Sequence, residues 1–263
     1  MSTSTYLDAV AEVARVAGAI ALGHYRRKVT IETKQDGSPV TVADRDAETA
    51  ARKWIERRFP HDGILGEEFP DVRSDSRYRW IIDPIDATKS FLRDVPLWGT
   101  LVAVAEGRHI IAGAAFFPAV SEMIVAADGF GCWWNDERAR VSTVAELSQA
   151  VILTSSIPFS TDPVVTARWR SLEERVIASR TWGDCFGYLM VASGRAEVMA
   201  DPVLSSWDIA AFLPIVKEAG GVVTDFRGDV TAFGGSAIAT NAALAETVHG
   251  LLIETPTADI GND

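Results

Sequence analysis

The 263-residue sequence has only two cysteines, no long apolar run and a shortage of positive charge. Cys132 and Cys185 are too few and too isolated for a disulfide framework or a thiolate metal site. No stretch reaches the roughly eighteen consecutive apolar residues that a membrane-spanning helix requires. With 25 Lys and Arg against 36 Asp and Glu, the formal net charge is −11. This excess argues against nucleic acid or an anionic membrane as the main partner, but it allows a phosphorylated small molecule if metal ions supply positive charge.

The N-terminal stretch also lacks the pattern of a secretory signal. Such a signal carries early positive charge and then an unbroken apolar core, whereas Asp8, Glu12 and Arg15 interrupt the apolar residues here. Apolar residues instead recur three and four positions apart, which predicts an amphipathic helix. They are Leu7, Val10, Val13, Val16, Ala17 and Ile20. We therefore expect a cytoplasmic protein with no membrane attachment.

The pattern of predicted elements divides the chain near residue 145. A helix over 43–58, ended by Pro60, precedes short strands that predict an antiparallel meander, and the polar stretch 70–79 predicts a surface loop. The predicted strands of this half are 64–65, 80–82, 100–104, 110–117 and 123–126. In the second half, strands and helices alternate: strands 151–155, 197–200, 222–226 and 237–240, and helices 163–177, after Gly183, 207–219 and at the end of the chain. We therefore predict an α+β half over 1–145 and an α/β half over 146–263.

Two aspartates lie close together where an apolar run ends. The run at 80–82 leads to Asp83, and Pro84 should stop the strand there because it has no N–H to donate. Asp86 and Thr88 follow where a turn or helix would begin, so their side chains could face the same space as Asp83. Two like charges about 4 Å apart cost roughly 4 kcal/mol at an effective dielectric constant near 20, and a divalent cation would offset that repulsion.

An isolated Asp-x-x-Asp more often marks only a strand end and a helix cap, but further acidic residues here favour a metal site. Glu67 and Glu68 follow another short strand, and Asp208 lies at the start of a predicted helix. Oxygen ligands without His or Cys partners suit Mg²⁺ or Mn²⁺ and not zinc.

Three motifs, in this order, resemble those of the inositol monophosphatase superfamily. They are Gly66-Glu67-Glu68, then Asp83-Pro84-Ile85-Asp86-Ala87-Thr88, and then Trp207-Asp208-Ile209-Ala210-Ala211 with Glu218-Ala219-Gly220-Gly221. The resemblance covers nearly the whole chain, and the combination of motifs is highly specific. It implies an α+β and α/β fold built as a layered αβαβα sandwich, usually assembled as a homodimer. It also implies a phosphatase that uses two to three Mg²⁺ ions per site, with Mn²⁺ as the alternative.

The resemblance assigns roles to individual residues. The metal ligands it implies are Glu67, Asp83, Asp86, Asp208 and the backbone carbonyl of Ile85. The catalytic residues it implies are Thr88, which helps to orient the attacking water, Asp44, which hydrogen-bonds that threonine, and Glu67. We expect Asp86, Ala87 and Thr88 to bind phosphate, with the backbone N–H groups after Asp86 holding phosphate oxygens at a helix N-terminus. Ala87 departs from the family, which usually has glycine there, and alanine is strained at that position if φ is positive.

Within the superfamily, the sequence is most similar to the histidinol-phosphate phosphatase branch. The segments that carry this similarity are 87–91, 99–101, 183–188 and 192–196. We expect the substrate to be held by Gly183, Asp184, Cys185, Tyr188, Asp201 and Asp208. Histidinol phosphate carries an ammonium group beside its phosphate, so carboxylates beyond the metal ligands would suit it. Asp184 and Tyr188 share one helical face, although Asp184 could instead be a helix N-cap without substrate contact.

Three other functions stay open at this point. An inositol-1-phosphate or other polyol phosphatase would use the same chemistry, and a bisphosphate nucleotidase is a third candidate. A non-catalytic phosphoester sensor is the candidate outside the enzymes, motivated by Ala87 alone. No Gly-x-Ser-x-Gly elbow, P-loop or Gly-x-Gly-x-x-Gly fingerprint occurs, which argues against a serine hydrolase or a nucleotide-binding fold.

Overall fold

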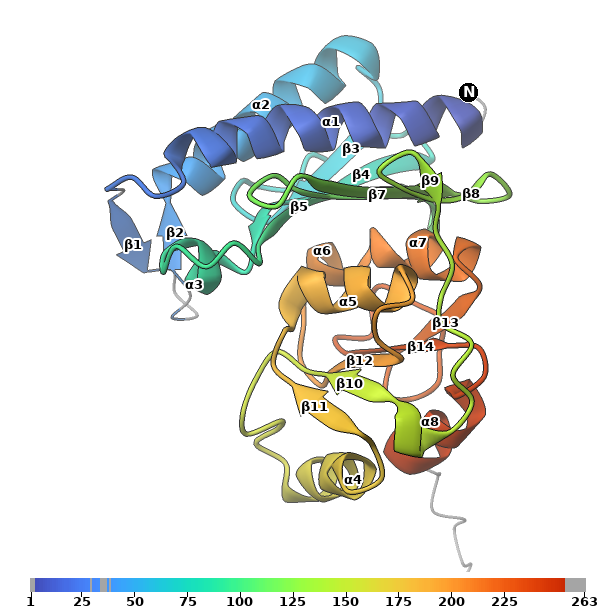
Figure 1. The fold of residues 1–263 in the computed structure, drawn as a ribbon. Helices are drawn as coiled ribbons and strands as arrows, with labels where there is room; N and C mark the ends of the chain where they lie inside the picture. The colour runs from blue at the N-terminus through green and yellow to red at the C-terminus, as the bar shows by residue number, and fades with distance from the viewer. Residues whose placement is uncertain (1–2, 29, 34–36, 38, 254–263) are drawn as a thin grey trace, which may run out of the picture.

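The computed structural model describes residues 3–28, 30–33, 37 and 39–253, and in it helices and sheets alternate in five layers (Figure 1). Helices α1 and α2 cover the outer face of a seven-stranded sheet, and α5, α6 and α7 lie between that sheet and a five-stranded one. Helices α4 and α8 cover the far face of the second sheet. The predicted αβαβα sandwich is therefore confirmed. None of the helices in the described ranges has the length and apolar character needed to cross a lipid bilayer.

The outer helices are α1 (Thr3–His24) and α2 (Val42–Arg58), joined through the two-stranded sheet of β1 (Ile31–Thr33) and β2 (Pro39–Thr41). Both predicted helices are confirmed, but the buried face of α1 differs from the predicted one. Val10, Val13 and Ala17 are fully buried, whereas Val16 and Ile20 are 36% and 39% exposed. Small alanines take their place on the inner face, which lets α1 lie close to the sheet.

The seven-stranded sheet confirms the predicted meander. Its strands are β3 (Gly63–Gly66), β4 (Tyr78–Asp86), β5 (Gly99–Glu106), β6 (His109–Phe117), β7 (Glu122–Ala127), β8 (Gly131–Trp134) and β9 (Glu137–Arg138). They are arranged in chain order, and every neighbouring pair is antiparallel except β3 and β4. The predicted loop at 70–79 is partly wrong, because Val72 pairs with Ile64 and β4 begins at Tyr78.

Pro84 does not end its strand, contrary to the sequence prediction. Strand β4 runs on to Asp86, and its pairing with β5 shifts register between Asp83 and Asp86. Side chains replace the lost ladder bonds, since Ile85 N donates to Asp83 Oδ1 at 3.0 Å and Thr100 Oγ1 donates to Pro84 O at 2.8 Å. The short helix α3 (Thr88–Phe91) then begins after Ala87. The irregularity brings both aspartates to one end of the sheet.

The five-stranded sheet has the order β11-β10-β12-β14-β13, with β10 parallel to β11 and β12 and the other pairs antiparallel. Its strands are β10 (Val151–Leu153), β11 (Ala178–Arg180), β12 (Val198–Asp201), β13 (Gly221–Thr224) and β14 (Ala237–Asn241). The helices of this half are the 3₁₀ turn η1 (Leu147–Gln149), α4 (Pro163–Glu173), α5 (Asp184–Ala192), α6 (Ser206–Ile209), α7 (Phe212–Glu218) and α8 (Ala245–Leu252).

Two predicted helices of the second half are shorter than expected. The helix predicted over 163–177 ends at Glu173, and β11 follows it. The helix predicted over 207–219 is two helices, α6 and α7, because Pro214 has no N–H for the carbonyl of Ala210. Gly220 ends α7 with φ +91°, the left-handed conformation expected of a C-terminal cap.

One apolar core joins the two sheets. A single cluster of buried side chains includes Leu101 and Ile124 from the first sheet, Phe212 and Ile215 from α7, and Met199 from the second sheet. The domain boundary predicted near residue 145 lies in the connection between β9 and β10. The core therefore contains residues from both sides of the predicted boundary.

Candidate active site

Three carboxylates meet beside the end of β4 in the seven-stranded sheet. Asp83 and Asp86 come from the irregular end of β4, and Asp208 comes from α6. One carboxylate oxygen from each lies within 4.8 Å of the others. The structure thus brings together three of the residues that the sequence analysis assigned to a metal site.

Each of these carboxylates has one oxygen fixed by a backbone amide. Asp83 Oδ1 accepts from Ile85 N, and Asp208 Oδ2 accepts from Ser205 N at 2.6 Å in the capping box of α6. Asp86 Oδ2 accepts from Cys185 N at 2.6 Å, a bond that joins the end of β4 to the first turn of α5. The backbone therefore orients all three groups before any ligand arrives.

The cluster carries more negative charge than its surroundings balance. Burial raises the pKa of Asp83 well above its usual range, and the charges of Glu67, Asp86 and Asp208 raise it further. Burial also raises the pKa of Asp86 and, to about 7, that of Asp208. Glu67, just after β3, is not one of these three clustered carboxylates, but its charge raises the pKa of both Asp83 and Asp208. A divalent cation is the group that oxygen ligands held this closely together are suited to bind.

The catalytic pair implied by the resemblance is arranged differently from the expectation. Asp44 is buried at the third position of α2, where its Oδ2 accepts from Thr41 N at 2.8 Å and from Thr41 Oγ1 at 2.6 Å. Thr88 Oγ1 donates to the carbonyl of Ile85 at 3.1 Å. In the described part of the chain, Asp44 and Thr88 therefore share no hydrogen bond.

Ala87 has the left-handed conformation that favours glycine. It precedes α3 with φ +67° and ψ +45°. Of the two alternatives stated for this position, the structure shows the strained one.

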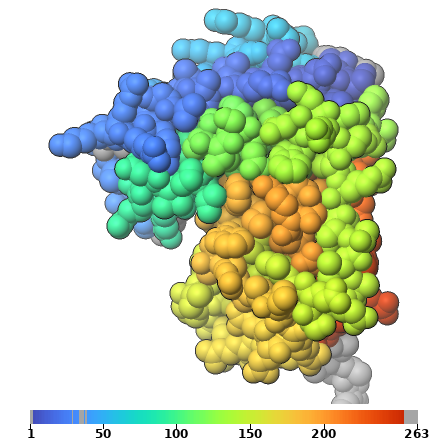
Figure 2. Space-filling view, in the orientation of Figure 1, coloured from blue at the N-terminus to red at the C-terminus, as the bar shows by residue number. Residues whose placement is uncertain are grey.

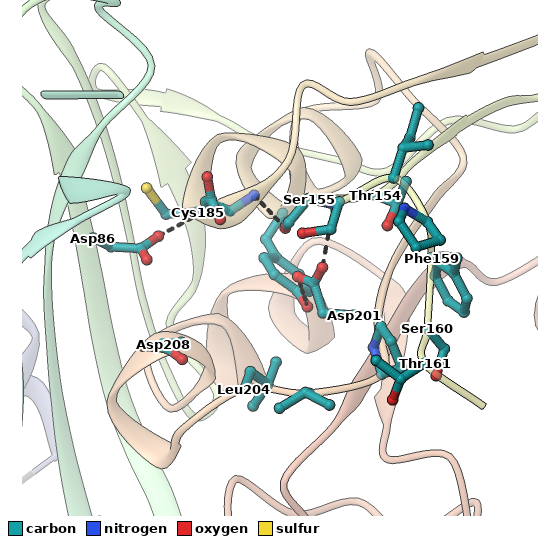
Figure 3. A pocket seen from close by; sticks show the side chains of 17 residues that line it. Asp86, Thr154, Ser155, Phe159, Ser160, Thr161, Cys185, Asp201, Leu204 and Asp208 are labelled. Atoms are coloured by element: carbon teal, nitrogen blue, oxygen red, sulfur yellow. Dashed lines mark hydrogen bonds between the residues drawn. The ribbon is translucent and has the colours of Figure 1, made fainter. Parts of the chain in front are cut away.

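A cavity of about 420 Å³ adjoins the carboxylate cluster (Figure 3). In the space-filling view, the surface is hollowed at the left between the teal segment that holds α3 and the gold segment that begins α5 (Figure 2). The lining includes Asp184, Cys185, Tyr188, Asp201 and Asp208, which the sequence analysis assigned to the substrate. It also includes the loop 154–161 and Leu204, which sequence reasoning missed.

Gly183, the remaining predicted substrate residue, lies outside the cavity lining. A Cβ atom there would overlap the backbone of Ser155 and Thr154. The missing side chain lets the first turn of α5 approach the end of β10. Gly183 is also the N-cap of α5, so the alternative interpretation of Asp184 as that cap is wrong.

Hydrogen bonds through Ser155 connect the backbone of Asp184 with the side chain of Asp201 in the cavity wall (Figure 3). Ser155 Oγ accepts from Asp184 N at 2.7 Å, and Ser155 N donates to Asp201 Oδ1 at 3.3 Å. Tyr188 Oη donates to Asp201 Oδ2 at 3.0 Å. Burial raises the pKa of Asp201 to about 6. Asp184 has φ +49°, and this strained backbone carries the Cys185 amide that holds Asp86.

A layered sandwich with a carboxylate cluster beside a cavity is an arrangement suited to metal-assisted hydrolysis. The chain belongs to the inositol monophosphatase family, whose model matches residues 3–256. It is 41% identical over 223 residues to a histidinol-phosphatase of Chlorobaculum parvum, covering 84% of this chain and 86% of the relative. It is 40% identical to a histidinol-phosphatase of Mycobacterium tuberculosis over 83% of this chain and 86% of the relative.

The fold is also similar to that of solved structures. The chain is similar to the extragenic suppressor protein SuhB of Bartonella henselae, with a TM-score of 0.88 and 29% identity, over 94% of this chain and 98% of that one. The family resemblance stated from the motifs is thus confirmed, and the protein is a phosphatase.

Proposed function

We propose that this protein is a Mg²⁺-dependent histidinol-phosphate phosphatase, which converts histidinol phosphate and water to histidinol and phosphate. The names of the two relatives support this substrate. The observation that carries the proposal is the charge of the cavity beside the cluster. Its described lining residues include Asp184 and Asp201 in addition to Asp86 and Asp208, and none of them is Lys, Arg or His.

This charge favours a leaving group that is a cation. The ammonium group of histidinol gains electrostatic attraction from Asp184 and Asp201 that the neutral hydroxyl groups of inositol do not. A charge pair about 4 Å apart is worth roughly 1 to 4 kcal/mol between bulk water and a protein surface. Even the lower figure corresponds to a severalfold preference in kcat/KM.

The residues present suit Mg²⁺. Asp83, Asp86, Asp208 and Glu67, with the carbonyl of Ile85, would hold it, because they are hard oxygen donors whose mutual repulsion a divalent cation relieves. When bound, Mg²⁺ supplies charge neutralisation of the phosphate and a lowered pKa for an attacking water. The choice of Mg²⁺ over Mn²⁺, and two to three ions per site, are part of this proposal.

The remaining groups would position the reactants. Thr88 Oγ1 donates a hydrogen bond to Ile85 O, so the lone pairs of Oγ1 remain to accept a hydrogen bond from the attacking water. Asp44 and Glu67 would complete the catalytic group, with Asp44 acting by fixing the start of α2. The amides of Ala87 and Thr88 would hold phosphate oxygens beside Asp86, since the first turn of a helix leaves its N–H groups without intrahelical acceptors.

Asp184→Asn tests the substrate. Asparagine has the same shape and tolerates positive φ, so the backbone at φ +49° should be retained. We expect kcat/KM for histidinol phosphate to fall by about tenfold or more at saturating Mg²⁺, while turnover of inositol 1-phosphate stays within about twofold. Asp136→Asn is the matched control, because Asp136 is an exposed aspartate with φ +68° that does not line the cavity. An unchanged kcat/KM for histidinol phosphate would show that Asp184 does not recognise the substrate.

The second candidate is an inositol-1-phosphate phosphatase, which the family as a whole favours. A higher kcat/KM for inositol 1-phosphate than for histidinol phosphate would support it. A bisphosphate nucleotidase would be revealed by hydrolysis of an adenosine bisphosphate. We further propose a homodimer, which light scattering after gel filtration would test, and a cytoplasmic location.

A further inference from the structure

Helix α2 carries a buried ion pair outside the carboxylate cluster. Glu48 is fully buried and Arg52 is 9% exposed, and Arg52 Nε donates to Glu48 Oε1 at 2.7 Å. With Asp44, these residues repeat every four positions, so they lie on one face of α2. A buried ion pair is weak evidence for stability, because desolvation of both charges offsets their attraction. A contribution to stability is therefore not a sufficient explanation for the Glu48–Arg52 pair.

Both members of the pair bind the backbone that follows β3. Glu48 Oε2 accepts from Glu68 N at 2.8 Å. Arg52 Nη2 donates to the carbonyl of Phe69 at 3.2 Å, and its guanidinium lies 5.7 Å from the centre of the Phe69 ring. The pair thus holds the loop on the C-terminal side of Glu67.

The residue before Glu67 is held by the same carboxylate. A Cβ atom at Gly66 would overlap the Glu48 carboxylate, so only glycine leaves room for Glu48 to lie against the end of β3. Glu67 is therefore enclosed between one neighbour in contact with Glu48 and another hydrogen-bonded to it. We propose that Glu48 and Arg52 are positioning residues that set the place of the Glu67 carboxylate and thereby the affinity of the site for its divalent cation.

The inference rests on the proposed function, because it assumes that Glu67 is a metal ligand. Groups that orient a metal ligand typically change metal affinity by about 10- to 100-fold when they are replaced. A purely structural pair would change thermal stability and leave metal affinity in the folded protein as it was.

The test measures Mn²⁺ binding to the full chain without substrate, from the electron paramagnetic resonance signal of free Mn²⁺. The double variant Glu48→Met with Arg52→Met removes both charges together, so no unpaired charge is left buried. We expect it to fold, as judged by circular dichroism, and to bind Mn²⁺ about tenfold more weakly or worse. Arg52→Lys is the milder second variant, since lysine keeps the charge beside Glu48 but cannot donate from two fixed nitrogens to Glu48 and to Phe69 O at once. It should weaken Mn²⁺ binding in the same direction.

Two controls separate the possible causes. Glu12→Met with Arg58→Met removes an ion pair between α1 and α2 whose side chains are about half exposed, and it should leave Mn²⁺ affinity within about twofold. Glu67→Gln should weaken Mn²⁺ binding directly. If Glu67→Gln weakens binding but the folded Glu48 and Arg52 variants retain wild-type affinity, the positioning role is refuted. If Glu67→Gln also leaves the Mn²⁺ affinity unchanged, the assignment of Glu67 as a metal ligand is refuted, and the inference is refuted with it.

Discussion

Ala87 is an alanine with a left-handed backbone conformation that glycine adopts more easily. Its φ of +67° costs an L-residue roughly 1 to 2 kcal/mol relative to the right-handed region, and glycine would avoid that cost. It lies directly after Asp86 and directly before Thr88, so the strain is stored at the centre of the site.

Replacing Ala87 with Gly should therefore stabilise the protein. Glycine also loses more entropy on folding, so we expect a net gain of about 1 kcal/mol or less in the free energy of unfolding. Urea denaturation measures it. Ala167→Gly is the matched control, because Ala167 is exposed within α4 and its replacement should destabilise by about 1 kcal/mol. Destabilisation by Ala87→Gly would contradict the assigned conformation.

At this scale the sequence motifs predicted the cluster of Asp83, Asp86 and Asp208 well, because two of the motifs supply its three carboxylates. What they could not predict are the backbone partners that hold these carboxylates. The Cys185 amide is 99 residues from Asp86 in the chain, and no local pattern indicates that contact. Ser155 was missed for the same reason, since its bonds to Asp184 and Asp201 form only when the strand ends meet.

Between elements, the glutamate at the end of α7 explains part of the third motif. Glu218 Oε1 accepts from Gly129 N at 2.9 Å, and its Oε2 accepts from Gly131 N at 2.7 Å. The carboxylate thus fastens α7 to the turn between β7 and β8. Glu218 is conspicuous in the motif although it lies outside the cavity lining.

Loss of this contact should affect stability and not chemistry. Hydrogen bonds to a charged group contribute about 1.5 to 3 kcal/mol, so Glu218→Ala should lower the free energy of unfolding by about 2 kcal/mol. Thermal unfolding checks the first expectation, and kcat at saturating substrate, which should stay unchanged, checks the second. A variant as stable as the wild type would show that the contact is dispensable.

Among the elements, the long periodic segments were predictable, and so were short strands such as β3 and β10, but some of the shortest strands were missed. The 22 residues of α1 and 17 of α2 give several turns of apolar spacing. Strands β9 and β11 have two and three residues, too few for any alternation to show. The end of β4 was mispredicted because Pro84 interrupts the ladder bonds, while side-chain oxygens of Asp83 and Thr100 replace them.

Over the whole molecule, the common core buries both cysteines in the sequence. Cys132 is fully buried and Cys185 is 1% exposed, and burial raises the pKa of the Cys132 thiol to about 12. Thiolate is the reactive form, so burial and this pKa both oppose reaction.

A disulfide reagent such as dithionitrobenzoate at pH 8 should therefore label neither thiol in the native protein. In guanidinium chloride it should label two, which is the cysteine count of the sequence. Rapid labelling of either thiol before unfolding would contradict the packing between the sheets.

The sequence predicted two halves because each sheet has its own pattern of strands. It did not predict the shared core, because the packing between the sheets depends on residues from both halves of the chain.

The most direct test of the proposed activity is phosphate release at saturating Mg²⁺, with histidinol phosphate compared against inositol 1-phosphate. Asp83→Asn serves as the control for the metal site and should abolish release from both. We predict a preference for histidinol phosphate of about a hundredfold in kcat/KM, or about 2.7 kcal/mol. Equal rates or a preference for inositol 1-phosphate would contradict the substrate, and phosphate binding without release from either would favour the non-catalytic sensor.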